Sequence, residues 1–547
     1  MLRKLRKTVR EKLDHVDSRL SSPQDDASVG QPGSHIVSRD GGRLQPADFP
    51  TQTDFFKFRK QRGVNLGSWF VLERWIADRP FREAHPPGQS DLDIARGTHA
   101  REILQDHWRN WILESDWAWL AETGINTVRI PIGFYHVCGA DQSVLRGTDF
   151  ADYASVFDDA WNHILNAIVT ANKYRIGVLL DLHAAPGKQN SDSHSGTSDP
   201  NPRFFEKSFN MRHTIHVLSV ALTHIIKFIN SFSPSLPNFV GIELLNEPAP
   251  GQHTVELKQW YSDAIRSLRA IDSRVPIVIG DSWQTEDYAG YLSHNADSLK
   301  HPHLVLDHHL YRCFTQEDIN VLAYDHAGRL WDLNGTTRRT FSNVTDKLES
   351  VGCDLMVGEW SGALNPKSLD PLPNKDHARS QLIQAQVDLY EQYCAGYFFW
   401  TLKKQWEGDK GWSFRDAVRG GVFPKSIGLR PRRPLEHHSR EARLNAREAA
   451  RSRSFGEHAA YWSRYPGSYE HWRFNEGFIQ GWDDAYVFFA SASGPVLTEL
   501  GYKGAWSKIR ERAHVASKGN GSCVWEYRHG FIQGLNAARL DVAAACC

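Results

Sequence analysis

Two glutamates are the residues of this chain best suited to acid–base chemistry. Glu247 lies in an Asn-Glu-Pro motif and Glu359 in a Gly-Glu-Trp motif, and each ends a short apolar run. Cleavage of a glycosidic bond requires one carboxylic acid that protonates the leaving oxygen and one carboxylate that attacks the sugar or activates water. The pair therefore points to glycosidic-bond chemistry, provided that the fold brings the two side chains together.

Eight apolar runs, separated by amphipathic segments such as 157–171 and 214–232, occupy residues 61–424. The runs are 62–67, 127–133, 177–184, 241–248, 275–282, 304–311, 355–360 and 396–403. Nearly continuous apolar strands that alternate with helices are typical of a parallel sheet. Eight such units predict an α/β fold, the (β/α)8 (TIM) barrel. A doubly wound open sheet is the competing fold, but no Gly-x-Gly-x-x-Gly motif follows the first run.

Several other runs also end in polar residues, among them Arg129, His183 and His309. The carboxyl ends of barrel strands face the active site, so we expect these side chains to converge with the two glutamates. Glu243 is expected to be a buried, paired charge rather than a catalyst. Asp181 and His183 could suggest a metal, but no third ligand is evident and the chemistry needs none. We therefore predict neither metal nor cofactor.

The segments on either side of the barrel differ from it in composition. Residues 1–60 predict a basic amphipathic helix over 1–20 and then a linker rich in Ser, Pro, Gly and Asp. Residues 425–547 predict a basic linker and a small helical region in which Gly-Phe-Ile-Gln-Gly occurs at 477–481 and again at 530–534. The repeat predicts two related helix-containing units.

The composition limits the classes of binding partner and the cellular compartments that we expect for this protein. Lys and Arg total 64 and Asp and Glu total 64, which argues against a nucleic-acid partner. Seven scattered cysteines without a CxxC motif favour reduced thiols. The N-terminus lacks the apolar core of a signal peptide, so we expect a cytoplasmic or membrane-peripheral protein. Residues 1–20 could contact an anionic membrane surface or form a solvated tail, lipidation of Cys546 and Cys547 stays open, and the oligomeric state is not predicted.

The chain resembles glycoside hydrolase family 5, in particular its fungal exo-β-1,3-glucanase (glucan 1,3-β-glucosidase) branch. The motifs that carry the resemblance are, in order, RGVNLGSWFVLE, GINTVRIPIGFYHV, VLLDLHAAPGKQN, GIELLNEP, LDHHLY, VGEW and FFWTLK. They extend over residues 61–424. The resemblance implies a retaining enzyme that cleaves terminal β-glucosidic bonds in glucan catabolism or cell-wall metabolism.

The resemblance also implies a role for each matching residue. Glu247 matches the acid/base and Glu359 the nucleophile. Arg129 matches the arginine that keeps the nucleophile ionised, and Tyr311 is expected to hydrogen-bond it. The remaining matches are sugar-binding residues, with Trp400 as the stacking platform and Phe314 at the pocket mouth: Glu73, His183, Asn246, His309, Phe314 and Trp400.

One loop departs from the family pattern. Asp192 stands where the branch has a phenylalanine that faces Phe314. Ser193 and His194 replace an Asp and an Asn that contact sugar hydroxyls, unless Asp192 takes over such a contact after a small shift of the loop. The linkage preference is therefore open. One alternative function is an intracellular β-glucosidase that acts on a glucosylated lipid or sterol. Another is a non-catalytic carbohydrate-binding scaffold, against which the two intact glutamates argue.

Overall fold

The computed structural model describes residues 49–547 except 297–298, 300–302, 426 and 492–493. Contacts divide the chain into two units, Met1–Phe49 and Pro50–Cys547, and the second contains the barrel and the C-terminal region. The predicted helix over 1–20 and the predicted linker from 21 to 48 lie outside the described residues. In the described part of the chain, no helix is both long enough and apolar enough to cross a membrane.

Eight parallel strands form a closed barrel in which each strand pairs with its neighbours in sequence and β8 pairs with β1. The prediction of a (β/α)8 barrel is thus confirmed. All eight expected runs form strands, because their apolar residues are buried on both faces. The strands are β1 (Gln61–Asn65), β2 (Thr127–Gly133), β3 (Gly177–Ala184), β4 (Phe239–Glu243), β5 (Ile277–Gly280), β6 (Leu304–Arg312), β7 (Asp354–Leu364) and β8 (Gly396–Phe399).

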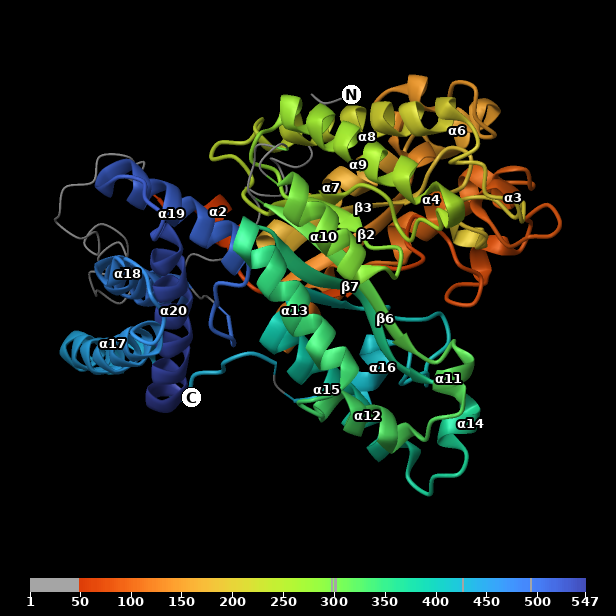
Figure 1. Cartoon of the computed structure of the whole chain (residues 1–547). Helices are drawn as coiled ribbons and strands as arrows, with labels where there is room; N and C mark the ends of the chain where they lie inside the picture. Colours follow the sequence, from red (N-terminus) through yellow and green to blue (C-terminus); the bar gives the residue numbers. More distant parts are fainter. Residues whose placement is uncertain (1–48, 297–298, 300–302, 426, 492–493) are drawn as a thin grey trace, which may run out of the picture. The chain divides into compact units, whose positions relative to one another are not determined.

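Helices follow the strands and surround the barrel (Figure 1). The main ones are α4 (Ala100–Asn110), α5 (Glu114–Thr123), α7 (Ala160–Lys173), α8 (Ser208–Ile229), α9 (Thr254–Ile271), α10 (Thr285–Asn295), α12 (Ala323–Trp331), α13 (Thr336–Val351) and α15 (Lys375–Tyr393). Shorter helices lie in the loops: α3 (Asp91–Ala95), α6 (Ala154–Phe157), α11 (Gln316–Ile319), α14 (Pro366–Leu369) and α16 (Phe414–Arg419).

Two strand ends differ from the sequence prediction. β4 ends at Glu243, so Asn246 and Glu247 lie in the following loop rather than on the strand. β7 continues beyond the predicted end at 360 to Leu364. The register between β6 and β7 shifts twice, and such irregularities re-aim side chains near active sites.

The sequence predicts linker up to residue 60, and this is wrong for its last part, where α2 (Gln52–Phe58) forms a helix. Thr51 and Asp54 make a capping box at its start. Phe58 stacks on His303 at 4.3 Å between ring centroids and meets Trp506 edge-on. The short helix is therefore held by buried aromatic contacts, which a reading of local composition does not detect.

The C-terminal region consists of two helical hairpins: α17 (Arg440–Trp462) with α18 (His471–Ala490), and α19 (Lys503–Lys518) with α20 (Val524–Cys546). His458 of α17 stacks on Phe474 of α18, and His514 of α19 stacks on Tyr527 of α20, each pair at 4.2 Å and 20°. The two hairpins are thus built alike, as the repeat predicts.

The repeated Gly-Phe-Ile-Gln-Gly motif explains how α18 and α20 cross. A Cβ atom on Gly481 would lie 2.0 Å from the carbonyl oxygen of Phe531, and one on Gly534 would lie 2.0 Å from that of Phe478. Only glycine permits such a close backbone approach. The glycines of the copy on α18 thus let the backbone of α20 approach closely, and the glycines of the copy on α20 do the same for α18 (Figure 1).

The C-terminal region attaches to the barrel at the amino ends of the strands. Arg62 in β1 pairs with Glu391 and with Glu499, which precedes α19. Asp354 at the start of β7 accepts hydrogen bonds from the backbone N–H groups of Gly504 and Ala505 in the first turn of α19. These contacts leave the carboxyl ends of the strands open for a site.

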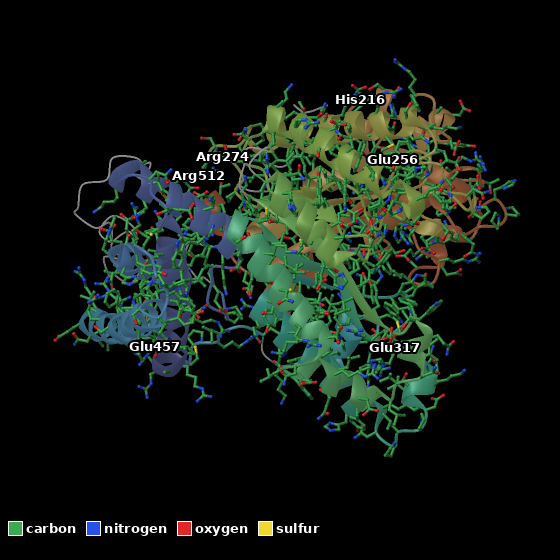
Figure 2. All side chains as sticks on the ribbon, in the orientation of Figure 1. His216, Glu256, Arg274, Glu317, Glu457 and Arg512 are labelled. Atoms are coloured by element: carbon green, nitrogen blue, oxygen red, sulfur yellow. The ribbon has the colours of Figure 1, made fainter. Side chains whose placement is uncertain are left out.

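Charges of both signs are distributed over the surface, in keeping with the balanced composition. Figure 2 labels examples on exposed positions: Glu256, Arg274, Glu317, Glu457 and Arg512.

Candidate active site

Arg129, in the middle of β2, joins the predicted site residues into one buried network. Its Nη1 donates to Glu359 Oε1 at 2.9 Å and its Nη2 donates to Asn246 Oδ1 at 2.8 Å. Its Nε donates to Glu243 Oε2 at 2.8 Å, and its Nη2 lies 3.1 Å from Asp181 Oδ2. Glu243 is thus the buried, paired charge that the sequence predicts.

Glu359 on β7 receives a second donor on its other oxygen. The Tyr311 hydroxyl, from β6, donates to Glu359 Oε2 at 2.8 Å. The expected contacts of Arg129 and Tyr311 with this glutamate are therefore both present. Two donors, one on β2 and one on β6, hold the carboxylate in one orientation.

Glu247 lies in the loop after β4 with a left-handed backbone, at φ 42°. Asn190 donates to its carbonyl oxygen at 3.0 Å, and Gln189 donates to that of Asn246, also at 3.0 Å. Such a conformation is costly for a residue with a side chain, and it persists only where the surroundings fix it. The loop after β3 therefore sets the direction of the Glu247 side chain.

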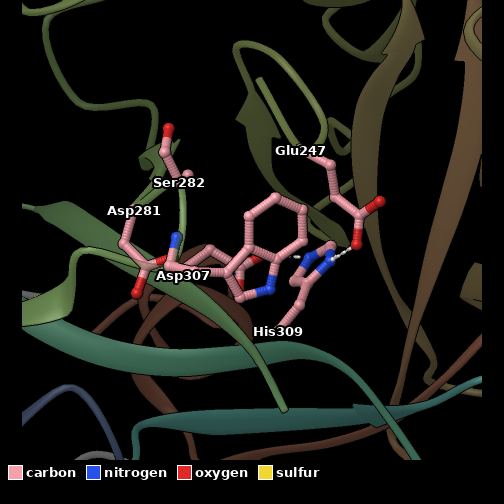
Figure 3. Close-up of a pocket in the computed structure, with 7 residues that line it drawn as sticks. Glu247, Asp281, Ser282, Asp307 and His309 are labelled. Atoms are coloured by element: carbon pink, nitrogen blue, oxygen red, sulfur yellow. Dashed lines mark hydrogen bonds and ion pairs between the residues drawn. The ribbon is translucent and has the colours of Figure 1, made fainter. Parts of the chain in front are cut away.

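His309 links the two glutamates. Its Nδ1 lies 2.8 Å from Glu247 Oε1, an interaction drawn in Figure 3, and 3.5 Å from Glu359 Oε2. Its Nε2 lies 3.3 Å from Asp307 Oδ2. One carboxylate oxygen of Glu247 and one of Glu359 lie within 4.8 Å of each other and of His309.

The same three side chains form one of the groups in the described chain whose geometry could hold a metal ion. The carboxylate oxygens of the two glutamates already accept hydrogen bonds from Arg129, Tyr311 and His309. A metal would have to displace those donors, so the arrangement fits a pair of reacting carboxyl groups better than a metal centre.

Burial and neighbouring charges shift the pKa values of the two glutamates in opposite directions. Burial acts to raise the pKa of Glu247, but the hydrogen bond and charge of His309, with the charge of His194, outweigh it and hold that pKa at about 2. Burial raises the pKa of Glu359 to about 7, although His309 and Arg129 oppose the shift. In the free site the two glutamates therefore share one proton between about pH 2 and pH 7.

The sugar-binding residues expected from the sequence lie around this pair. Burial lowers the pKa of His183 well below its usual value, so the ring is neutral. Its Nδ1 lies 2.7 Å from Asp181, and its Nε2 lies 3.4 Å from the Asn246 amide. Trp400, just beyond β8, lies parallel to His183 at 5.6 Å. Glu73 accepts a hydrogen bond from Trp75 at 2.8 Å, and burial raises its pKa to about 7.

Aromatic residues that the sequence analysis did not select lie at the mouth of the site. Trp412 contacts both Tyr311, at 5.4 Å, and Phe314, at 5.9 Å between ring centroids. Phe314 itself is 66% exposed. Trp283, on the loop after β5, lines a small hollow together with Glu247 and His309 (Figure 3).

His194, one of the residues at which the loop departs from the family pattern, lies in the site. Its Nε2 lies 3.8 Å from Glu247 Oε2, and its ring lies 4.9 Å from that of His183. No spacing rule predicts this contact, because it depends on the path of the loop after β3.

Comparison with known proteins agrees with this geometry. The family model "Cellulase (glycosyl hydrolase family 5)" matches residues 97–405, and the model "Glucan 1,3-beta-glucosidase 3 C-terminal domain" matches residues 444–541. Glucan 1,3-beta-glucosidase 3 of Schizosaccharomyces pombe is 32% identical over 499 residues, which are 89% of this chain and 96% of the relative. An uncharacterized glycosyl hydrolase of Saccharomyces cerevisiae is 28% identical over 93% of this chain and 96% of its own length.

Among solved structures, the rutinosidase from Aspergillus niger is similar with a TM-score of 0.51 and 18% identity. The match covers 68% of this chain and 99% of the rutinosidase. At this identity the likeness concerns the fold. The barrel and its paired glutamates are those of a glycosidase. By the extent of the matching model and the identity to the S. pombe relative, the chain belongs to glycosyl hydrolase family 5.

Proposed function

We propose that this protein is an exo-acting glucan 1,3-β-glucosidase that releases glucose with retention of configuration. One observation carries the mechanism: carboxylate oxygens of Glu247 and Glu359 lie within 4.8 Å of each other. Retaining glycosidases hold their two carboxyl groups about 5–5.5 Å apart, whereas inverting enzymes need about 6.5–9.5 Å to admit a water molecule. A separation within this bound supports direct attack by one glutamate.

In the first step Glu359 attacks the anomeric carbon while Glu247 gives its proton to the departing oxygen. The bond between sugar and aglycone breaks, and a glycosyl ester forms on Glu359. In the second step Glu247, now ionised, takes a proton from water, which attacks the same carbon and frees Glu359. Arg129 and Tyr311 support Glu359 as the nucleophile, because they stabilise the carboxylate each time it is released.

The first step needs the proton that the two glutamates share to lie on Glu247. His309 is placed to move it, since its Nδ1 lies 2.8 Å from Glu247 and 3.5 Å from Glu359. A substrate that excludes water and carries a basic glycosidic oxygen next to Glu247 favours the protonated form of that residue. We infer that substrate binding completes the proton transfer.

The substrate side of the proposal combines the site with the relatives. Trp400 offers an apolar ring face for a glucose unit, and Glu73 and His183 offer polar groups for its hydroxyls. Trp283 and Phe314 flank the place of the aglycone. The S. pombe relative is named a glucan 1,3-beta-glucosidase, which supports β-1,3-glucan as the natural substrate class.

A product screen tests this proposal. Purified protein is incubated with β-1,3-glucan, β-1,6-glucan, cellobiose and a glucosylated lipid, and the released sugars are separated. We expect glucose as the first product and fastest release from β-1,3-glucan. Release of long oligosaccharides would overturn the exo mode, and faster release from the lipid would overturn the substrate class.

A further inference from the structure

The loop after β3 places a second histidine against the proposed acid/base. The 3₁₀ helix η5 (Ser193–Ser195) carries His194, and the loop is anchored on the Glu247 backbone through Asn190. Asn190 Oδ1 accepts from the backbone N–H of Asp192 at 3.0 Å. Ser195 Oγ closes the turn by donating to the carbonyl of Asp192 at 2.6 Å. The position of His194 relative to Glu247 is therefore fixed.

His194 and Asp192 form a pair. His194 Nε2 lies 3.7 Å from Asp192 Oδ2 and 3.8 Å from Glu247 Oε2. The histidine side chain is 15% exposed, while that of Asp192 is 66% exposed. Among the described residues, His194 Nδ1 is buried without a hydrogen-bond partner. All polar contacts of the ring in this loop are thus made by Nε2 and lead to carboxylates.

The surroundings favour the charged form of His194. Burial alone would lower its pKa, but Asp192, Glu73 and Glu247 raise it to about 9. The titratable groups that face Glu247 are three histidines, three acids and one tyrosine: His309, His194, His183, Glu359, Glu73, Asp181 and Tyr311. His183 is neutral, so the cations beside Glu247 are His309 and His194. His309 lies next to Oε1 of Glu247, and His194 lies next to Oε2.

We propose that His194 is a positioning residue that holds Glu247 Oε2 and, with Asp192, sets the pH range in which the acid/base works. The inference deepens the proposed function and rests on it. Two of the departures from the family loop, Asp192 and His194, then act together: the acid replaces an aromatic ring and secures the cation beside the catalytic pair. Loss of that cation makes the shared proton harder to remove.

The test is the pH dependence of kcat/KM on an aryl β-glucoside for His194→Asn and Asp192→Asn, with Ser193→Ala from the same loop as control. Because a cation is lost, we expect the alkaline limb of His194→Asn to move to higher pH by about half a unit or more. Asp192→Asn should move it less in the same direction, since His194 then loses its proton earlier. Ser193→Ala should leave the limb in place.

Limbs of both variants that superimpose on the wild type would overturn the proposal, even with a lower kcat, because a merely structural role changes the rate and not the pH at which it falls. Asp192 is largely exposed, so Asp192→Asn gives a readout even if His194→Asn does not fold. A wild-type protein without activity on any β-glucoside would instead refute the proposed function, and the two failures are therefore distinct.

Discussion

The hydroxyl of Tyr311 on β6 donates to Glu359 Oε2 on β7 over 2.8 Å, and burial together with Glu359 raises the pKa of that tyrosine well above its usual value. The raised pKa keeps the phenol protonated, and therefore a donor, around neutral pH. It stabilises the charge of Glu359 each time the ester breaks.

Tyr311→Phe removes this donor and leaves the ring. A hydrogen bond to a charged group contributes about 1.5–3 kcal/mol, so we expect kcat to fall by about 10- to 100-fold. Kinetics on an aryl β-glucoside measure the change, and circular dichroism checks the fold. A kcat within twofold of the wild type would show that the contact does not act in the reaction.

The shared proton predicts how activity depends on pH. Burial raises the pKa of Glu359 to about 7, and the His309 charge holds that of Glu247 at about 2. The pair thus holds the one proton that the first step needs between these limits, and loses it as the pH rises through about 7. We expect the alkaline limb of kcat/KM to fall near pH 7. A profile that is flat to pH 9 would contradict this proton count.

The helix crossing of the C-terminal region predicts a steric effect. Gly481→Ala places a methyl group 2.0 Å from the Phe531 carbonyl oxygen, so α18 and α20 must separate. Overpacking of this kind costs about 1–3 kcal/mol of unfolding free energy.

Gly456→Ala on α17 is the matched control, because a Cβ atom there meets nothing within 4 Å. It should stabilise the helix by up to about 1 kcal/mol. Urea unfolding of both variants measures the difference. Equal stability of the two would mean that the repeat does not form the close crossing.

Buried Glu526 on α20 predicts acid sensitivity of the same region. Burial opposes its charge, but hydrogen bonds from His458 and His471, at 2.9 and 2.7 Å, lower its pKa below the usual value. A depressed pKa contributes stability above the unfolded-state pKa, which is lost as the pH falls through the folded-state pKa.

Glu526→Gln should therefore reduce the unfolding free energy at pH 7 and flatten its decline toward acid. Urea unfolding at several pH values measures both effects. An unchanged slope below about pH 5, the region where carboxylates take up protons, would show that Glu526 does not contribute to the acid dependence.

Much of the barrel could be predicted from the sequence, because strands buried on both faces are continuous apolar runs and their carboxyl ends carry the polar residues. The contacts of Arg129, Tyr311 and Glu359 are consequences of that topology. The place of His194 could not be predicted, since a loop path depends on anchors such as Asn190. The role of Gly481 and Gly534 was equally hidden, because a repeat does not reveal that its two copies pack on each other.

The central claim is that Glu359 attacks the sugar directly while Glu247 acts as acid and then as base. Glu247→Gln and Glu359→Gln should each reduce hydrolysis by several orders of magnitude without loss of fold. The most direct measurement is a proton NMR time course of the first glucose released by the wild type from a β-glucoside. Retention predicts that β-glucose appears first and then equilibrates, whereas initial release of α-glucose would contradict the mechanism.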